Sequence, residues 1–135
     1  MNTPKNVIAI DRISVLDVIG FKRISSSTVE ISSQTPWIKI PIKVPAKLTV
    51  SEKIEDRVRM YTAQLVYRTC EETQYRNRIV YRCRTADGRY WLIGSDARPY
   101  PITTVNKVRP DNMTDSQLDE VTVNFTSSYK IPYII

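Results

Sequence analysis

Hydrophobic and polar side chains alternate in the segment PWIKIPIKVP, residues 36–45. On an extended chain the members of one side would be Ile38, Ile40, Ile42 and Val44, and those of the other Trp37, Lys39, Pro41 and Lys43. A period of two is typical of a half-buried β-strand. Because Pro41 cannot donate a backbone hydrogen bond and lysines discourage unwanted sheet pairing, we predict that this segment is an edge strand.

Several other short segments also favour strands. Residues rich in β-branched and aromatic types are found at 28–33, 60–70, 79–85, 89–94 and 121–126. A helix is the competing interpretation over Glu52–Met60, because this part contains good helix formers, and we favour a strand from about Met60 onward after one helical turn. The segment Ala9–Phe21 fits either a strand or a short helix, and residues 109–119 a loop with one helical turn near Ser116. We therefore predict a single mostly β domain over residues 1–135, an antiparallel β-sandwich or small β-barrel with little helix.

The dipeptide Asp87-Gly88 predicts a two-residue hairpin turn between the strands at 79–85 and 89–94. Counting from such a turn pairs Ala86 with Arg89 and Arg84 with Trp91. One face of the hairpin would then carry Ile79, Tyr81, Cys83, Tyr90 and Leu92. This face is expected to be buried in the core. The other face would carry Arg76, Arg78, Val80, Arg82, Arg84, Trp91 and Ile93.

This arginine-rich face has three interpretations. It is an ordinary solvated face if the arginine stems cover Trp91. It is a protein interface if the tryptophan and arginines act as binding hot spots, in which case Trp91, Arg82 and Arg84 would be covered by another subunit. It binds nucleic acid if the arginines contact phosphates and the aromatic rings stack on bases. In each case, a contact between the Arg84 cation and the Trp91 ring is expected to contribute about 0.5–1 kcal/mol.

Composition argues against several functions. The chain of 135 residues has a net charge of +6 and no histidine, so the usual general base and the commonest metal ligand are both lacking. The two cysteines, Cys70 and Cys83, cannot complete a zinc site by themselves and are expected to be buried free thiols. We therefore expect no enzymatic activity, no cofactor and no metal. No apolar run approaches the roughly 20 residues that span a bilayer, so no membrane association is expected.

The order of features from residue 35 onward resembles small β-rich structural proteins of tailed bacteriophages and prophages. The resemblance rests on the strand at 57–70, the hairpin around Thr85-Ala86-Asp87-Gly88, the Arg98-Pro99-Tyr100-Pro101 segment and the terminal residues Val121–Ile135. It implies a neck or tail subunit that forms a homo-oligomer, contacts other virion proteins and is assembled in the host cytoplasm. A nucleic-acid-binding β domain is the alternative function.

The two chain ends allow further expectations. Residues 1–27 are treated as an extended N-terminal segment. Residues 127–135 end in an apolar sequence and form either a last strand of the same domain or an arm that docks on a neighbour. The candidate interface residues on the hairpin and the C-terminal segment are Arg76, Arg78, Arg82, Arg84, Trp91, Ile93, Tyr129 and Tyr133.

Overall fold

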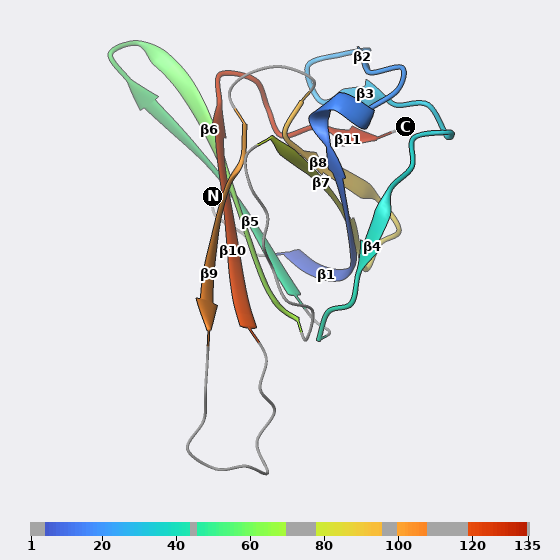
Figure 1. Cartoon of the computed structure of the whole chain (residues 1–135). Helices are drawn as coiled ribbons and strands as arrows, with labels where there is room; N and C mark the ends of the chain where they lie inside the picture. The colour runs from blue at the N-terminus through green and yellow to red at the C-terminus, as the bar shows by residue number, and fades with distance from the viewer. Residues whose placement is uncertain (1–4, 44–45, 70–77, 96–99, 108–118, 135) are drawn as a thin grey trace.

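In the computed structural model, the described part of the chain forms eleven β-strands in one continuous sheet (Figure 1). The structure describes residues 5–43, 46–69, 78–95, 100–107 and 119–134. The strands are β1 (Lys5–Ser14), β2 (Lys22–Arg23), β3 (Thr28–Glu30), β4 (Ile38–Ile40), β5 (Ala46–Glu55), β6 (Val58–Thr69), β7 (Ile79–Thr85), β8 (Tyr90–Ile93), β9 (Ile102–Lys107), β10 (Asp119–Ser127) and β11 (Tyr133–Ile134). The predicted mostly β domain with little helix is confirmed, since the one helical element of the described residues is the 3-10 turn Val15–Asp17.

The sheet has the strand order β2-β3-β11-β8-β7-β1-β5-β6-β10-β9, with β4 attached to β1. Neighbouring strands are antiparallel except for β11 and β3, which are parallel. The order begins at β2 and ends at β9, so the sheet is not closed into a barrel.

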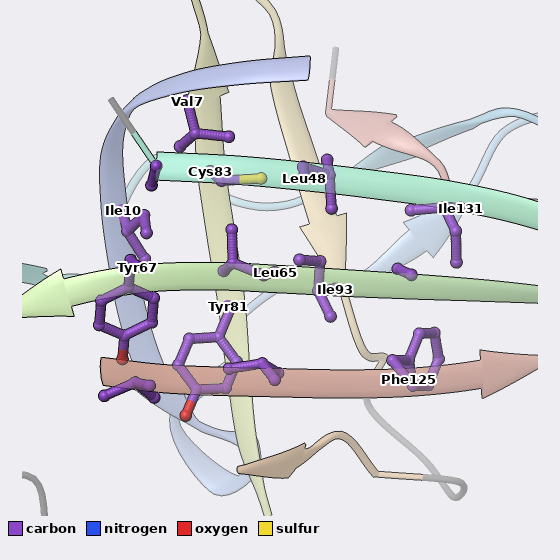
Figure 2. Packing of buried hydrophobic residues seen from close by; sticks show 14 of the residues in the cluster. Val7, Ile10, Leu48, Leu65, Tyr67, Tyr81, Cys83, Ile93, Phe125 and Ile131 are labelled. Atoms are coloured by element: carbon purple, nitrogen blue, oxygen red, sulfur yellow. The ribbon is translucent and has the colours of Figure 1, made fainter. Parts of the chain in front are cut away.

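The main core lies where β5, β6 and β10 face β1, β7 and β8 (Figure 2). Tyr67 on β6 and Tyr81 on β7 are its largest fully buried side chains. Leu48, Leu65 and Ile93 are also fully enclosed. Burying a large apolar side chain contributes about 1.5–3 kcal/mol, so this cluster is the main source of stability for the fold.

A second core covers the opposite face of β7, β8 and β1. Val80 and Leu92 point to this side and pack with Ile13 and with Val29 and Ile31 from the segment that follows β1. Strands β7 and β8 are therefore buried on both faces along part of their length. Simple alternation of apolar and polar residues is consequently weak in these two strands.

The N-terminal residues form a central strand. β1 pairs with β7 on one side and, on the other, first with β5 and then with β4. Its register with β7 shifts between Val7 and Ala9, where Ile8 is an extra residue. Such a bulge resets the alternation of side chains, so that Val7 and Ile10 both point into the main core. The ambiguous Ala9–Phe21 segment is a strand through Ser14 and then a single 3-10 turn.

The predicted edge strand is confirmed as β4, which pairs only with β1 in the part of the chain that the structure describes. Its predicted apolar face is only partly correct. Ile40 is buried, whereas Ile38 is 48% exposed. The strand is only three residues long, and Ile40 is its one buried residue.

The helical turn expected before Met60 is wrong. Strands β5 and β6 instead form a long hairpin that extends beyond the rest of the sheet (Figure 1). Asp56 and Arg57 make its two-residue loop, with φ values of 50° and 65°. Two consecutive residues with positive φ are typical of the turn type whose twist matches that of paired strands. Pairing with β6 overrides the helix propensity of this segment.

The predicted register of the β7–β8 hairpin is also wrong, by one residue. The strands pair Cys83 with Trp91 and Arg84 with Tyr90. The turn is a three-residue loop: the Gly88 N–H donates to the Thr85 carbonyl at 2.9 Å, and the Thr85 N–H donates to the Arg89 carbonyl at 3.0 Å. Gly88 has φ +89°, as expected for the residue that closes a bulged loop of this kind.

This shift has a large effect, because a slip of one residue moves every side chain of a strand to the other face. Trp91 and Ile93 lie on the face of Tyr81 and Cys83, not with the arginines. The predicted face that joins Trp91 to Arg82 and Arg84 therefore does not exist.

Among the remaining expected elements, the strand predicted at 121–126 is confirmed within β10, and the one predicted at 28–33 is confirmed as the shorter β3. The structure places β11 between β8 and β3 of the same sheet. In this structure the C-terminal segment therefore contributes a last strand of the same domain, which was one of its two interpretations. Residues 109–118 of the predicted loop lie outside the described residues, and so do Cys70 and Arg76.

Candidate interaction site

A pocket of about 280 Å³ lies between the base of the β5–β6 hairpin and the strands β8 and β11. Aromatic rings, aliphatic side chains, two serine hydroxyls and two charged groups line it. The lining residues are Ser27, Val50, Ser51, Glu52, Tyr61, Trp91, Lys130, Ile131 and Tyr133. The wall from β5 and β6 and the wall from β8 and β11 are far apart in the sequence, so only the folded sheet creates this site.

Trp91 and Tyr133 form the aromatic wall. They are directly paired across the β8–β11 ladder. Their ring centroids are 5.8 Å apart and the ring planes meet at 68°, the edge-to-face geometry that aromatic pairs favour. The Trp91 indole N–H donates to the Thr85 hydroxyl at 3.3 Å. The Tyr133 backbone N–H donates to the Ser27 carbonyl at 3.0 Å, so both rings are held in place.

Cations gather around this wall. The Lys5 ammonium lies 5.0 Å from the centroid of the Trp91 ring, and the Arg89 guanidinium 5.0 Å from that of Tyr133. Lys130 adds a third positive charge as an exposed lining residue. A cation over an aromatic face is attracted by the ring quadrupole by about 0.5–1 kcal/mol at an exposed position.

Two carboxylates lie near these cations, and both have partners. Glu52 forms an ion pair with the Nε of Arg59 at 2.8 Å. A hydrogen bond with Tyr61, followed by the charge of Glu52, raises the pKa of the Arg59 guanidinium. The Thr85 hydroxyl and the Arg89 backbone N–H donate to Asp87 and lower the pKa of its carboxyl group, with smaller effects from the charges of Arg89 and Lys5.

The structure separates the predicted interface residues. It brings Trp91 and Tyr133 together in the pocket. Ile93, expected beside Trp91 on an open face, has no exposed surface and belongs to the main core. Tyr129 is 58% exposed, with the Arg23 guanidinium 4.4 Å from its ring centroid. Arg78 is exposed, has φ 70° and lies 5.9 Å from the Tyr100 ring.

Arg82 and Arg84 lie on the opposite face of the β7–β8 hairpin. Arg82 forms an ion pair with Asp11 on β1, and its guanidinium lies 4.6 Å from the Trp37 ring and 4.8 Å from the Tyr90 ring. Arg84 is 5.8 Å from the Tyr90 ring, so the predicted contact with Trp91 is replaced by one with Tyr90. Arg82 is thus engaged by residues of its own chain.

Sequence reasoning did not find the remaining pocket residues. Tyr61 and Glu52 are directly paired across the β5–β6 ladder, but their segment was expected to contain a helical turn. Recognising Asp56-Arg57 as a hairpin turn would have placed both on the core-facing side. Lys130 and Lys5 carry no local pattern that distinguishes them from other surface lysines.

Within the described ranges, no group of three or more His, Cys, Asp or Glu side chains is placed to hold a metal ion. No helix in that part of the chain is long and apolar enough to cross a membrane. Comparison with known protein families, with characterised proteins and with solved structures finds no match for this chain.

Proposed function

We propose that the protein is a non-enzymatic structural subunit of a phage-like particle, a neck or tail component that acts by self-association and by contacts with other virion proteins. The resemblance over residues 35–135 motivates this assignment. The structural observation that carries it is the projecting β5–β6 hairpin (Figure 1), whose tip exposes two aliphatic side chains.

The tip exposes two large aliphatic side chains outside either core. Ile54 is 64% exposed and Val58 is 51% exposed. Ile54 is paired with Arg59 and Val58 with Glu55, so the two aliphatic side chains point to opposite faces of the hairpin. Covering either one in a neighbouring subunit would be favourable by up to about 1.5–3 kcal/mol. A projecting hairpin with an exposed aliphatic side chain on each face is suited to insertion between two neighbours.

Sedimentation velocity over a range of protein concentrations tests this proposal. The wild-type chain is expected to assemble as concentration rises, and the double variant Ile54→Asp, Val58→Asp to stay monomeric. Leu16→Asp is the matched control, because Leu16 is 81% exposed on the 3-10 turn. It receives the same substitution and should assemble normally. A wild-type chain that stays monomeric at all concentrations would contradict self-association.

A nucleic-acid-binding domain is the second candidate. The observation that favours it is the series of cations over aromatic rings near β8 and β11, formed by Lys5 on Trp91, Arg89 on Tyr133 and Arg23 on Tyr129. Proteins that bind single strands combine positive grooves with stacking rings. The test is binding to an oligonucleotide at several salt concentrations. A plot of the logarithm of the binding constant against the logarithm of the salt concentration, with a slope of about −1 per phosphate contact, would favour this function over the structural one.

A further inference from the structure

We propose that the pocket between the β5–β6 hairpin and β11 binds an acidic segment of a partner protein that inserts one aromatic side chain. This inference rests on the proposed structural function and specifies the chemistry of one of its contacts. The proposed occupant is not the β5–β6 hairpin tip of a neighbouring copy, because the charges around the pocket favour a segment with net negative charge.

The volume of the pocket favours a side chain over a larger ligand. At about 280 Å³ it lies just below the range for small-molecule sites, which is roughly 300–1,000 Å³. Val50 and Ile131 provide aliphatic contacts, and Tyr61 and the Trp91–Tyr133 pair provide aromatic ones. An aromatic side chain can use both kinds of surface, and aromatic residues are common anchors in protein interfaces.

The charges around the pocket determine what should flank that anchor. Lys5, Arg89 and Lys130 are cations close to the aromatic wall. Glu52 is ion-paired with Arg59. The pKa of Asp87 is lowered by the hydrogen bond from the Thr85 hydroxyl and also by the charges of Arg89 and Lys5, with which it interacts. This single carboxylate offsets only part of the charge of the three cations, so the surroundings of the pocket stay net positive towards an incoming group. Carboxylates on both sides of the anchor would complement them, whereas a basic segment would be repelled.

The fluorescence of Trp91, which lines the pocket, can report whether the pocket is occupied. The chain contains two tryptophans, Trp37 and Trp91. Trp37 contacts Arg82 on the other face of the hairpin and does not line the pocket. In a Trp37→Phe variant, fluorescence therefore reports on Trp91 alone, and an aromatic side chain that enters the pocket should shift its emission to shorter wavelength.

The experiment titrates this variant, at a concentration where it is monomeric, with the peptide acetyl-Glu-Asp-Phe-Glu-Asp-amide. Three comparison probes are used: the same peptide with serine in place of phenylalanine, the peptide acetyl-Lys-Lys-Phe-Lys-Lys-amide, and a ten-nucleotide oligothymidylate. We expect the acidic phenylalanine peptide to bind at least tenfold more tightly than each of the others. Adding Lys130→Glu and Arg89→Glu should weaken its binding at least tenfold, and the exposed control Lys39→Glu on β4 should leave binding unchanged.

Three results would overturn the inference: no binding of the acidic phenylalanine peptide, equal binding of the lysine peptide, or tighter binding of the oligonucleotide, which would assign the site to nucleic acid. The outcome is separate from that of the sedimentation test, because the titration uses monomeric protein. Failed peptide binding with concentration-dependent assembly removes only the pocket inference. Peptide binding without assembly removes self-association but retains the pocket.

Discussion

Two nitrogens of Arg82 on β7 donate to the same oxygen of Asp11 on β1, Nε at 3.0 Å and Nη2 at 2.6 Å from Oδ2. The two residues are directly paired in the β1–β7 ladder. Their side chains are 25% and 14% exposed, and the rings of Trp37 and Tyr90 flank the guanidinium. The pair therefore joins the N-terminal strand to the hairpin that the sequence had suggested as an interface.

We predict that Arg82→Ala lowers the free energy of unfolding by about 2 kcal/mol, because it removes charge-assisted hydrogen bonds and leaves Asp11 without its partner in a mostly covered position. Arg84→Ala is the matched control: Arg84 is exposed two residues further along β7, and its loss should change stability by less than about 0.5 kcal/mol. Urea unfolding followed by circular dichroism measures both. Equal effects of the two substitutions would contradict the structural role of Arg82.

The three-residue loop of the β7–β8 hairpin predicts a specific cost at Gly88. A methyl group there would meet no atom within 4 Å, so Gly88→Ala tests backbone conformation without a steric clash. With φ at +89°, we expect a loss of about 1–2 kcal/mol. Gly88→Asn should lose less, because asparagine tolerates positive φ better than alanine. A neutral Gly88→Ala variant would argue against the bulged loop.

Asp87 predicts a dependence of stability on acid pH. Its pKa lies below the ordinary value of 3.8, chiefly because of the hydrogen bond from the Thr85 hydroxyl. A lowered pKa in the folded state stabilises the fold above the unfolded pKa, and this contribution is lost as the pH falls through the folded one. The wild-type protein should therefore be more stable than Asp87→Asn at pH 7, with a smaller difference at pH 3. Unfolding curves at the two pH values measure this, and a constant difference would contradict it.

The buried thiol of Cys83 predicts slow reaction with thiol reagents and a loss of stability at alkaline pH. Burial raises the pKa of its thiol to about 12. In a Cys70→Ser background, where Cys83 is the sole cysteine, native protein at pH 8 should react with a thiol-specific disulfide reagent only as fast as it unfolds. Because the folded pKa is raised above the ordinary value of 9.0, this thiol contributes stability below that value, which is lost as the pH rises from 9.0 towards about 12. Rapid reaction of the folded protein would show that Cys83 is accessible.

Part of the candidate site follows from local sequence. Trp91 was identified as a candidate because it was expected beside arginines on one face of the hairpin, and Tyr133 because it lies in the apolar C-terminal segment that could dock on a neighbour. Their mutual contact could not be derived, since it depends on β11 pairing with β8. Glu52 and Tyr61 were missed for a related reason, because the helix formers in Glu52–Met60 concealed a hairpin turn without glycine.

The sequence by itself determined the β character of this protein and the position of most of its strands. β-Branched and aromatic side chains pack well on a pleated sheet, and alternation with a period of two forms an apolar face only on a strand. Pro41, directly after β4, and the neighbouring lysines favour an edge position. These are properties of neighbouring residues, which local physical chemistry controls.

Only the tertiary structure decided which face of each strand meets which partner. The sequence Thr85–Arg89 is compatible with a loop of two or of three residues, and β8 places either Trp91 or Leu92 towards the main core accordingly. Because β7 and β8 are buried on both faces, their own alternation does not distinguish the two registers. Packing against β6, β10 and the segment after β1, whose residues are distant in sequence, selects the register. In the selected register Trp91 lies in the pocket and not on the face of Arg82 and Arg84.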